Sequence, residues 1–369
     1  MQYVRMPIEV ESPEERGYET IAYNLSESSV ADLSLQEIGG IDTTVKLAYT
    51  DHKGKPALRK LIADQYSNIS EDDVLLSCGA AAALFMINTC LLNAVSHLVV
   101  VRPNYATNIA VPVAAGCAIS YIDLTIENQW RLDIAALEAA VTSNTKLISI
   151  TSPHNPTGMM LAEEELKKII AVAEANNIYL LVDETYRDIC FDAPYPLAAS
   201  MSEKVISISS VSKAYGLPGL RIGWAITKDK WLFEKLLAAK EMIHITNSVL
   251  DEELCFSFLQ KRAYWKQKIN KSAVENLAVL KEWLQKENRL EYVLPQAGVV
   301  CFPAIKKELD IDYPVFYEKL LSKYGTMVGP GHWFDMSQRF MRIGFAWTDK
   351  DILAKGLENI SRCLNDFTG

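Results

Sequence analysis

The chain has too little positive charge for a protein that binds nucleic acid. Its 369 residues include 37 lysines and arginines against 46 aspartates and glutamates, a formal net charge of -9. Binding to phosphates needs a basic face, so no nucleic-acid partner is expected. Long apolar runs are also missing, since none approaches the roughly 20 residues that cross a bilayer. Segment 1–17 is acidic and has no apolar signal region, which predicts a cytoplasmic protein with no membrane partner.

Cysteine and histidine are sparse and scattered. The seven cysteines are odd in number and form no C-x-x-C pair, which predicts reduced thiols rather than a disulfide framework. The five histidines form no H-E-x-x-H motif and no set with cysteine. Because zinc needs such clustered ligands, no metal site is expected.

What the chain does contain is a long alternation of strands and helices between about residues 55 and 228. Apolar runs such as 98–101 and 178–182 are typical of strands that are buried on both faces of a sheet. Helical patterns of ten or more residues separate these strands. The alternation predicts an α/β fold with a doubly wound, mainly parallel sheet.

The pattern changes after residue 229. Two long helices are predicted at 230–260 and 263–285, and strands 298–302 and 340–346 then alternate with helices 314–323 and 350–365. These elements predict a smaller α+β domain, because single cores seldom exceed roughly 250–300 residues. We expect a large domain at 46–270 and a small discontinuous domain made of 1–45 and 271–369.

Reactive side chains follow the predicted strands, and parallel sheets bind ligands at the carboxyl ends of their strands. Gly79, Ala80 and Ala81 open a helix directly after a strand, where free N–H groups and the helix dipole favour an anion. Asn155 precedes a proline in a punctuated turn that aims its amide. A tight turn and a plain loop are the alternative interpretations of these two segments.

A carboxylate and a lysine complete the set. Asp183 ends a buried strand, where a carboxylate is costly unless it meets a cation or strong donor; capping a following turn is the alternative. In segment 209–224, Ser210 and Ser212 flank Lys213, and Arg221 follows eight residues later. A nearby arginine helps to keep a lysine unprotonated and therefore nucleophilic.

Together these groups are the parts of a pyridoxal phosphate (PLP) site. A lysine forms the Schiff base, an aspartate pairs with the pyridinium nitrogen, and hydroxyls, an arginine and a helix N-terminus hold the phosphate. Asparagine and tyrosine can hydrogen-bond the ring hydroxyl, and Tyr186 lies three residues after Asp183. The sequence therefore predicts PLP as the cofactor.

The runs N155-P-T-G158, D183-E-T-Y186 and S210-V-S-K213, followed by G-L-P-G-L-R221-I-G-W, resemble the class I/II aminotransferases of PLP fold type I. The likeness extends from Tyr49 to Arg342 in the family's order. It implies that Lys213 forms the Schiff base and then moves the substrate proton, and that Asp183 pairs with the ring nitrogen. It also implies that Asn155 and Tyr186 contact the ring oxygen, and that the phosphate is bound by Ser210, Ser212, Arg221 and the amides of Gly79, Ala80 and Ala81.

The resemblance extends to the substrate side of the site. Tyr105 matches an aromatic residue that stacks on the ring, with a buried aromatic at a helix start as the alternative. Tyr49 matches a tyrosine that reaches the phosphate of the neighbouring subunit, which implies a homodimer. Arg342 matches the arginine that grips the substrate carboxylate, with Asn155 beside it. The preceding loop makes His332 and Trp333 candidates for the pocket, although packing explains the histidine equally well.

Two departures from the family's pattern concern the substrate. The segment Leu25–Val30 stands where many relatives have a Gly-x-Pro turn, and segment 243–259 lacks the arginine that some dicarboxylate-specific relatives use. Both argue against an aspartate-specific enzyme without selecting another substrate.

The expected reaction is transfer of an amino group from an L-amino acid to a 2-oxo acid. β-Elimination, decarboxylation and intramolecular cyclisation remain open, because the same cofactor supports them. Ser210-x-x-Lys213 is also the nucleophile motif of Ser-Lys acyl-enzymes, but its companion motifs are missing. A non-catalytic PLP-sensing domain of a transcription regulator would need a DNA-binding module, for which the segment before residue 56 leaves no room.

Overall fold

A seven-stranded sheet organises the computed structural model, which describes residues 1–368. Its strand order is β2-β8-β7-β6-β5-β3-β4. Only β8 runs antiparallel to its neighbours, so the predicted mainly parallel sheet is confirmed. The strands are β2 (Val74–Ser77), β3 (His97–Arg102), β4 (Ala118–Asp123), β5 (Thr145–Thr151), β6 (Tyr179–Asp183), β7 (Val205–Ser210) and β8 (Gly223–Ile226).

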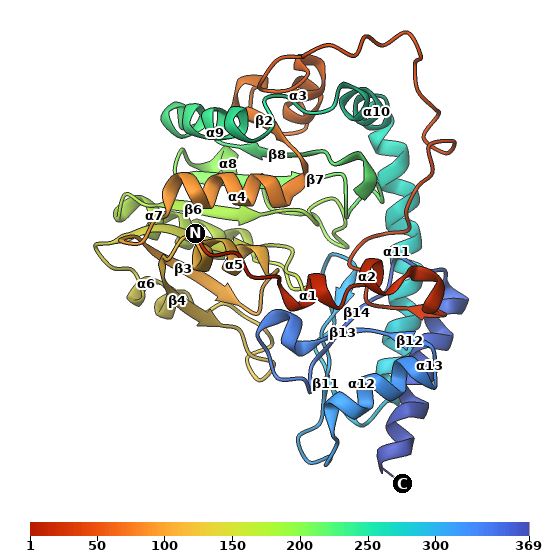
Figure 1. Cartoon of the computed structure of the whole chain (residues 1–369). Helices are drawn as coiled ribbons and strands as arrows, with labels where there is room; N and C mark the ends of the chain where they lie inside the picture. Colours follow the sequence, from red (N-terminus) through yellow and green to blue (C-terminus); the bar gives the residue numbers. More distant parts are fainter. Residues whose placement is uncertain (369) are drawn as a thin grey trace.

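Helices cover both faces of this sheet (Figure 1). Successive residues of a strand point to opposite faces. Leu181 of β6 therefore packs with residues of α4 and α9, whereas Leu180 and Val182 pack with residues of α7. This double burial explains the uninterrupted apolar runs in the sequence. The helices are α3 (Pro56–Ala63), α4 (Gly79–Leu91), α5 (Thr107–Ala114), α6 (Ile134–Ala139), α7 (Glu163–Ala175), α8 (Ala198–Met201) and α9 (Lys230–Ile243).

The C-terminal part is an α+β unit around a small antiparallel sheet of order β10-β14-β13. Figure 1 draws it below the large sheet, with the long α11 running between the two levels. Whether the domains divide at 46–270 remains a prediction. The elements are α10 (Val249–Leu259), α11 (Arg262–Lys286), β9 (Leu290–Glu291), β10 (Val300–Cys301), β11 (Ala304–Ile305), α12 (Tyr313–Ser322), β12 (Thr326–Met327), β13 (Gly329–Pro330), β14 (Met341–Gly344) and α13 (Lys350–Thr368).

The single helix expected at 230–260 is wrong, because the chain breaks between α9 and α10. Ile245 has a φ of 56°, a left-handed conformation that no helix interior accepts. Ser248 then caps α10 by accepting a hydrogen bond from the Asp251 amide at 3.4 Å. The hydrophobic period continues across the break, and for that reason the periodicity alone did not reveal it.

The N-terminal segment contains short helices that the sequence analysis did not predict. They are α1 (Pro7–Val10), α2 (Pro13–Arg16) and a 3₁₀ turn, Tyr18–Thr20, and both α-helices start at a proline. The next element, β1 (Tyr23–Asn24), pairs in parallel with β12. Figure 1 shows α1 and α2 beside β13 and β14. The segment from α1 to β1 thus packs on the C-terminal part, whereas the Gln2 amide donates to the carbonyl of Ala114 at the end of α5.

No helix among residues 1–368 is long and apolar enough to cross a membrane.

Candidate active site

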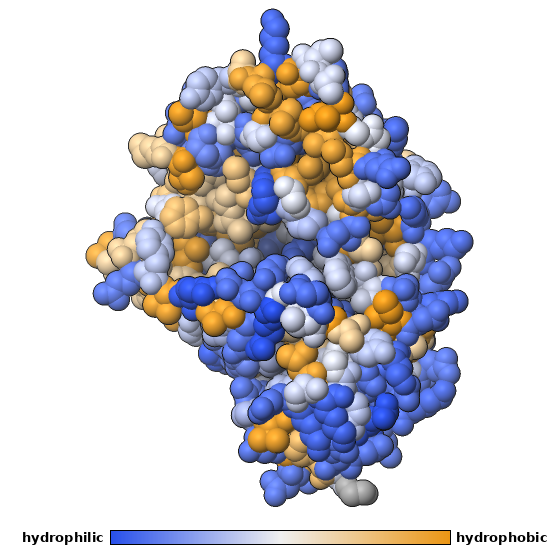
Figure 2. Space-filling model, turned by 45° about the vertical axis from the view of Figure 1, so that its right-hand side comes forward, coloured by the Kyte–Doolittle hydropathy of each residue, from blue (hydrophilic) through white to orange (hydrophobic). Residues whose placement is uncertain are grey.

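Most of the candidate residues that follow the strand ends line one cavity. The surface is hollowed near the middle of the face shown in Figure 2. The candidates come from the start of α4, the loops after β3 and β5, the end of β6, the segment between β7 and β8, and β14. Those that line the cavity are Ala80, Ala81, Tyr105, Asn155, Asp183, Tyr186, Ser210, Ser212, Lys213, Arg221 and Arg342.

Lys213 lies in this cavity as a half-buried amine. Burial lowers the pKa of its side chain, and the positive charge of Arg342 lowers it further, against the opposing effect of Glu27. Lys213 has no ion-pair partner within 4 Å among the described residues. Its carbonyl accepts a hydrogen bond from the Val30 amide at 3.1 Å, which fixes the N-terminal segment beside it. An amine held in its neutral form can attack a carbonyl carbon.

Asp183 is a buried carboxylate with no cation beside it in the described chain. It is 5 % exposed, and burial raises the pKa of its carboxyl above the usual value. The hydrogen bonds to its Oδ1 come from Thr185, from the amide at 3.1 Å and the hydroxyl at 2.6 Å. Such a group is costly unless a positive group arrives. A protonated ring nitrogen would meet this need.

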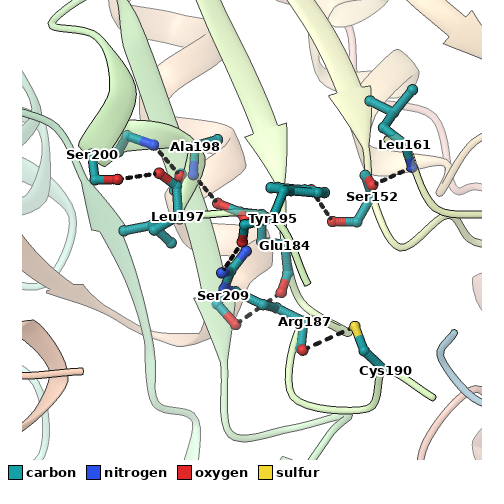
Figure 3. A network of polar contacts seen from close by, with 12 residues as sticks. Ser152, Leu161, Glu184, Arg187, Cys190, Tyr195, Leu197, Ala198, Ser200 and Ser209 are labelled. Carbon is teal, nitrogen blue, oxygen red and sulfur yellow. Dashed lines mark hydrogen bonds and ion pairs between the residues drawn. The ribbon is translucent and has the colours of Figure 1, made fainter. Parts of the chain in front are cut away.

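A polar network under the strand ends holds the neighbouring loops in place (Figure 3). Glu184, the residue after Asp183, is fully buried and pairs with Arg187 at 2.8 Å. Arg187 also donates to the carbonyl of Tyr195, and the Tyr195 hydroxyl donates to the Ser152 carbonyl at 2.9 Å. The network links the end of β6 to the loop after β5, which carries Asn155.

The other end of the cavity is suited to an anion. Gly79 has a φ of 80°, and an added Cβ would lie 2.5 Å from Nη2 of Arg221, so only glycine allows this approach. Arg221 itself has a φ of 49° and donates to the carbonyls of Pro218 at 2.9 Å and Cys78 at 3.3 Å. The Ser212 hydroxyl is buried without a partner among the described residues. These donors surround the N-terminus of the 13-residue α4.

Arg342 lies at the opposite end of the cavity and is only 4 % exposed. Its Nη1 donates to Oδ1 of Asn155 at 3.2 Å, and its Nη2 donates to the carbonyl of Ser26 at 2.6 Å. Its Nε is buried and has no partner within the described chain. Burial lowers the pKa of the guanidinium from its usual value. A buried arginine with a free donor can bind a planar carboxylate.

The fold and these contacts agree with a family comparison. The model of "Aminotransferase class I and II" matches residues 36–360. The chain belongs to this family. Its cofactor is pyridoxal phosphate, and the resemblance seen in the sequence is confirmed. The unpaired Asp183, the unpartnered Ser212 hydroxyl and the Gly79–Arg221 cradle all fit that group.

The chain is similar to several named proteins. Capreomycidine synthase of Streptomyces vinaceus is 27% identical over 92% of this chain and 88% of its own. An aspartate aminotransferase of Musicola paradisiaca is 26% identical over 86% and 82%. The crystal structure of a PLP-dependent aminotransferase from Streptococcus suis superposes with a TM-score of 0.92, 26% identity and full coverage of both chains. The expected PLP fold type I is thereby confirmed.

Three candidates do not line the cavity of this chain, namely Gly79, Tyr49 and His332. Tyr49 is 81 % exposed and lines no part of it, so its role remains a prediction. His332 turns away: its Nε2 lies 2.9 Å from Oε2 of Glu11, and its Nδ1 lies 3.1 Å from Nε2 of Gln338. Packing, the alternative interpretation, is the better one for this histidine. Its neighbour Trp333 does line the cavity.

The sequence analysis missed the N-terminal wall of the cavity. This wall consists of Ile8, Glu9, Ser12, Pro13, Glu14, Ser26, Glu27 and Ser28. The Ser28 carbonyl accepts a hydrogen bond from the Tyr186 hydroxyl at 2.8 Å, and the Ser26 carbonyl accepts one from Arg342. The segment without the Gly-x-Pro turn therefore still covers the site. The two prolines and four glutamates between Pro7 and Glu15 were the available signal.

Proposed function

We propose that the chain transfers an amino group from an L-amino acid to a 2-oxo acid, with the cofactor carried as a Schiff base on Lys213. One observation carries this proposal. Three side chains line one cavity: Lys213, whose amine pKa is lowered by burial, Asp183, a buried carboxylate without a cationic partner, and Arg342, a buried arginine with a free donor among the described residues. These three groups provide a nucleophile and base, a partner for a ring nitrogen, and a partner for a carboxylate.

On the cofactor side, we assign Asp183 to the ring nitrogen and Asn155 and Tyr186 to the ring oxygen, to which the Tyr186 hydroxyl would donate in place of its bond to the Ser28 carbonyl. Tyr105 stacks on the ring. When bound, pyridoxal phosphate draws electrons from the substrate Cα and so makes its proton easier to remove. The phosphate takes its hydrogen bonds from Ser210, Ser212, Arg221 and the amides of Gly79, Ala80 and Ala81.

On the substrate side, Arg342 binds the α-carboxylate and thereby fixes which face of Cα meets Lys213. Asn155, hydrogen-bonded to Arg342, orients the guanidinium. Lys213 would be the base that removes the proton from Cα, a role that its lowered pKa supports because an amine accepts a proton only in its neutral form.

A spectroscopic half-reaction tests this proposal. An amino acid added to the holoenzyme should shift the cofactor absorbance to that of the amine form, and a 2-oxo acid should restore the original band. Release of pyruvate and ammonia without this exchange would contradict transamination and indicate elimination.

Cyclisation of an amino acid is the second candidate, because capreomycidine synthase is among the relatives. In that case a cyclic amino acid would form, no 2-oxo acid would be required, and the original band would return by itself. The Ser-Lys acyl-enzyme finds no support, since Ser210 ends strand β7 instead of opening a helix.

We also propose a cytoplasmic homodimer in which Tyr49 reaches the phosphate of the partner. The segment 31–55 has no helix or strand and arches around one edge of the molecule in Figure 1. It carries three exposed apolar side chains, Leu35, Leu47 and Tyr49, and Met242 and Ile243 are exposed as well. Figure 2 shows a hydrophobic area on the upper part of the molecule. Mixing a Tyr49→Ala chain with a Lys213→Ala chain should restore activity, since each mixed dimer keeps one intact site.

A further inference from the structure

The cavity contains more carboxylates than the proposed reaction uses. Its charged lining residues are Lys213, Arg221 and Arg342 against Glu9, Glu14, Glu27 and Asp183. Under the proposed function, Asp183 pairs with the ring nitrogen, while Arg221 and Arg342 meet the phosphate and the substrate carboxylate. Three glutamates are left over. All three come from the N-terminal segment and face the same space as Lys213.

These three differ from Glu11 and Glu15 of the same segment, which have cationic partners. Glu11 pairs with His332 and accepts a hydrogen bond from Trp333 at 2.7 Å, and Glu15 pairs with Arg5 at 2.7 Å. In contrast, Glu9, Glu14 and Glu27 have no cation within 4 Å among the described residues. Their negative charge therefore remains available to a ligand.

Glu27 is the most firmly placed of the three. Its Oε1 accepts a hydrogen bond from the Tyr18 hydroxyl at 2.8 Å, and the Tyr18 ring stacks on Trp347 at 5.8 Å. Its backbone lies against β14, since a Cβ at Gly344 would meet the Glu27 carbonyl at 1.7 Å. Arg342 is two residues earlier on that strand. The guanidinium of Arg342 and the carboxylate of Glu27 are thus held at fixed positions relative to each other.

Independent groups show that this cavity is built for a ligand. Arg342 and Ser212 line it and are 4 % and 7 % exposed, and the Nε of Arg342 and the hydroxyl of Ser212 have no partner among the described residues. Buried polar atoms are rarely left without a partner in the state that functions. Charge at Glu27, Glu14 and Glu9 also reaches Lys213, where it opposes the lowering of the amine pKa by burial.

We infer that the substrate is an amino acid with a cationic side chain, whose ammonium or guanidinium group lies against Glu27, Glu14 and Glu9 while its α-carboxylate lies against Arg342. This inference rests on the proposed function for the position of the carboxylate. The two opposite charges of the substrate would each meet a complementary group, which fixes the orientation of the bound substrate. A substrate with an anionic side chain would meet three uncompensated carboxylates.

Binding of substrate mimics without an α-amino group tests the inference without turnover. δ-Guanidinovalerate carries the carboxylate and the cation, and δ-ureidovalerate is its neutral counterpart of nearly the same shape. Calorimetric titration of the holoenzyme should give the guanidino compound an affinity at least about tenfold higher, because it adds a charge-assisted hydrogen bond. The pair ε-aminocaproate and caproate separates an ammonium preference from a guanidinium preference.

The variant Glu27→Gln keeps the shape of the side chain and removes its charge, so the affinity ratio should fall toward one. Glu19→Gln is the matched control, because Glu19 belongs to the same segment and does not line the cavity. Equal binding of the charged and neutral members of both pairs by the unmodified enzyme would overturn the inference. So would an equal loss of preference in both variants. A holoenzyme whose absorbance responds to no amino acid would instead refute the proposed function.

Discussion

Replacing Arg342 by lysine should weaken substrate binding while leaving the cofactor in place. The guanidinium offers three donor nitrogens, of which Nη1 serves Asn155, Nη2 serves Ser26 and Nε has no partner in the described chain. A carboxylate that accepts two parallel hydrogen bonds from this fork would find no such planar pair of donors on an ammonium group, whose N–H bonds diverge from one nitrogen. A hydrogen bond to a charged group contributes about 1.5–3 kcal/mol, so the affinity should fall roughly ten- to one-hundredfold.

The assay is the half-reaction of the holoenzyme with an amino acid, followed by cofactor absorbance over a range of concentrations. The apparent dissociation constant should rise by the stated factor, and the absorbance band before addition should be unchanged. Arg339→Lys is the matched control, since Arg339 donates to Glu291 at 3.1 Å and to the Ile305 carbonyl at 3.2 Å, outside the cavity. An unchanged dissociation constant in the Arg342 variant would refute the assignment of the α-carboxylate.

Three further changes test the cofactor end. Lys213→Met should stabilise the cofactor-free protein more at about pH 8 than at about pH 10, as measured by urea denaturation. Burial lowers the pKa of the Lys213 amine from its usual 10.5, so as the pH falls the unfolded chain binds a proton before the folded chain does. The lysine therefore costs the folded state more stability at the lower pH, and methionine removes this cost. Gly79→Ala should reduce cofactor affinity about tenfold or more by displacing Arg221, whereas Gly219→Ala, whose Cβ meets nothing within 4 Å, should not. Asp183→Asn should weaken cofactor retention by roughly ten- to one-hundredfold and suppress turnover, measured by dialysis and by the half-reaction.

The large sheet and the cofactor end of the site could be predicted because their signals are local. Leu180, Leu181 and Val182 are buried on alternating faces, so the strand appears as one apolar run. A polar residue directly after such a run lies at the carboxyl edge of the sheet, and Asp183 was identified in this way. Lys213 was found by the same reasoning after β7. Short segments of sequence therefore contain most of the cofactor site.

Where contacts are distant in sequence, the prediction failed or remained open. The break after Ile243 depends on the left-handed Ile245, whose neighbours continue the apolar period of the helix. His332 sits in a loop typical of a substrate pocket, but its partner is Glu11, 321 residues away. Neither a hydrophobic period nor a sequence motif predicts such a contact, because the two residues meet only after the chain has folded.

The difference between local signals and contacts distant in sequence also explains why the sequence predicted the cofactor but not the substrate. Residues that hold the cofactor follow strand ends in one continuous sheet, so their spacing is constrained by the fold. The glutamates that face the substrate belong to a segment whose position depends on the pairing of β1 with β12 and on the bond from Val30 to the Lys213 carbonyl. That segment can change its side chains without disturbing the sheet. We therefore expect the N-terminal segment, which contains no recognisable motif, to determine the choice of substrate. Mutations in this segment should change substrate specificity more than they change the stability of the fold.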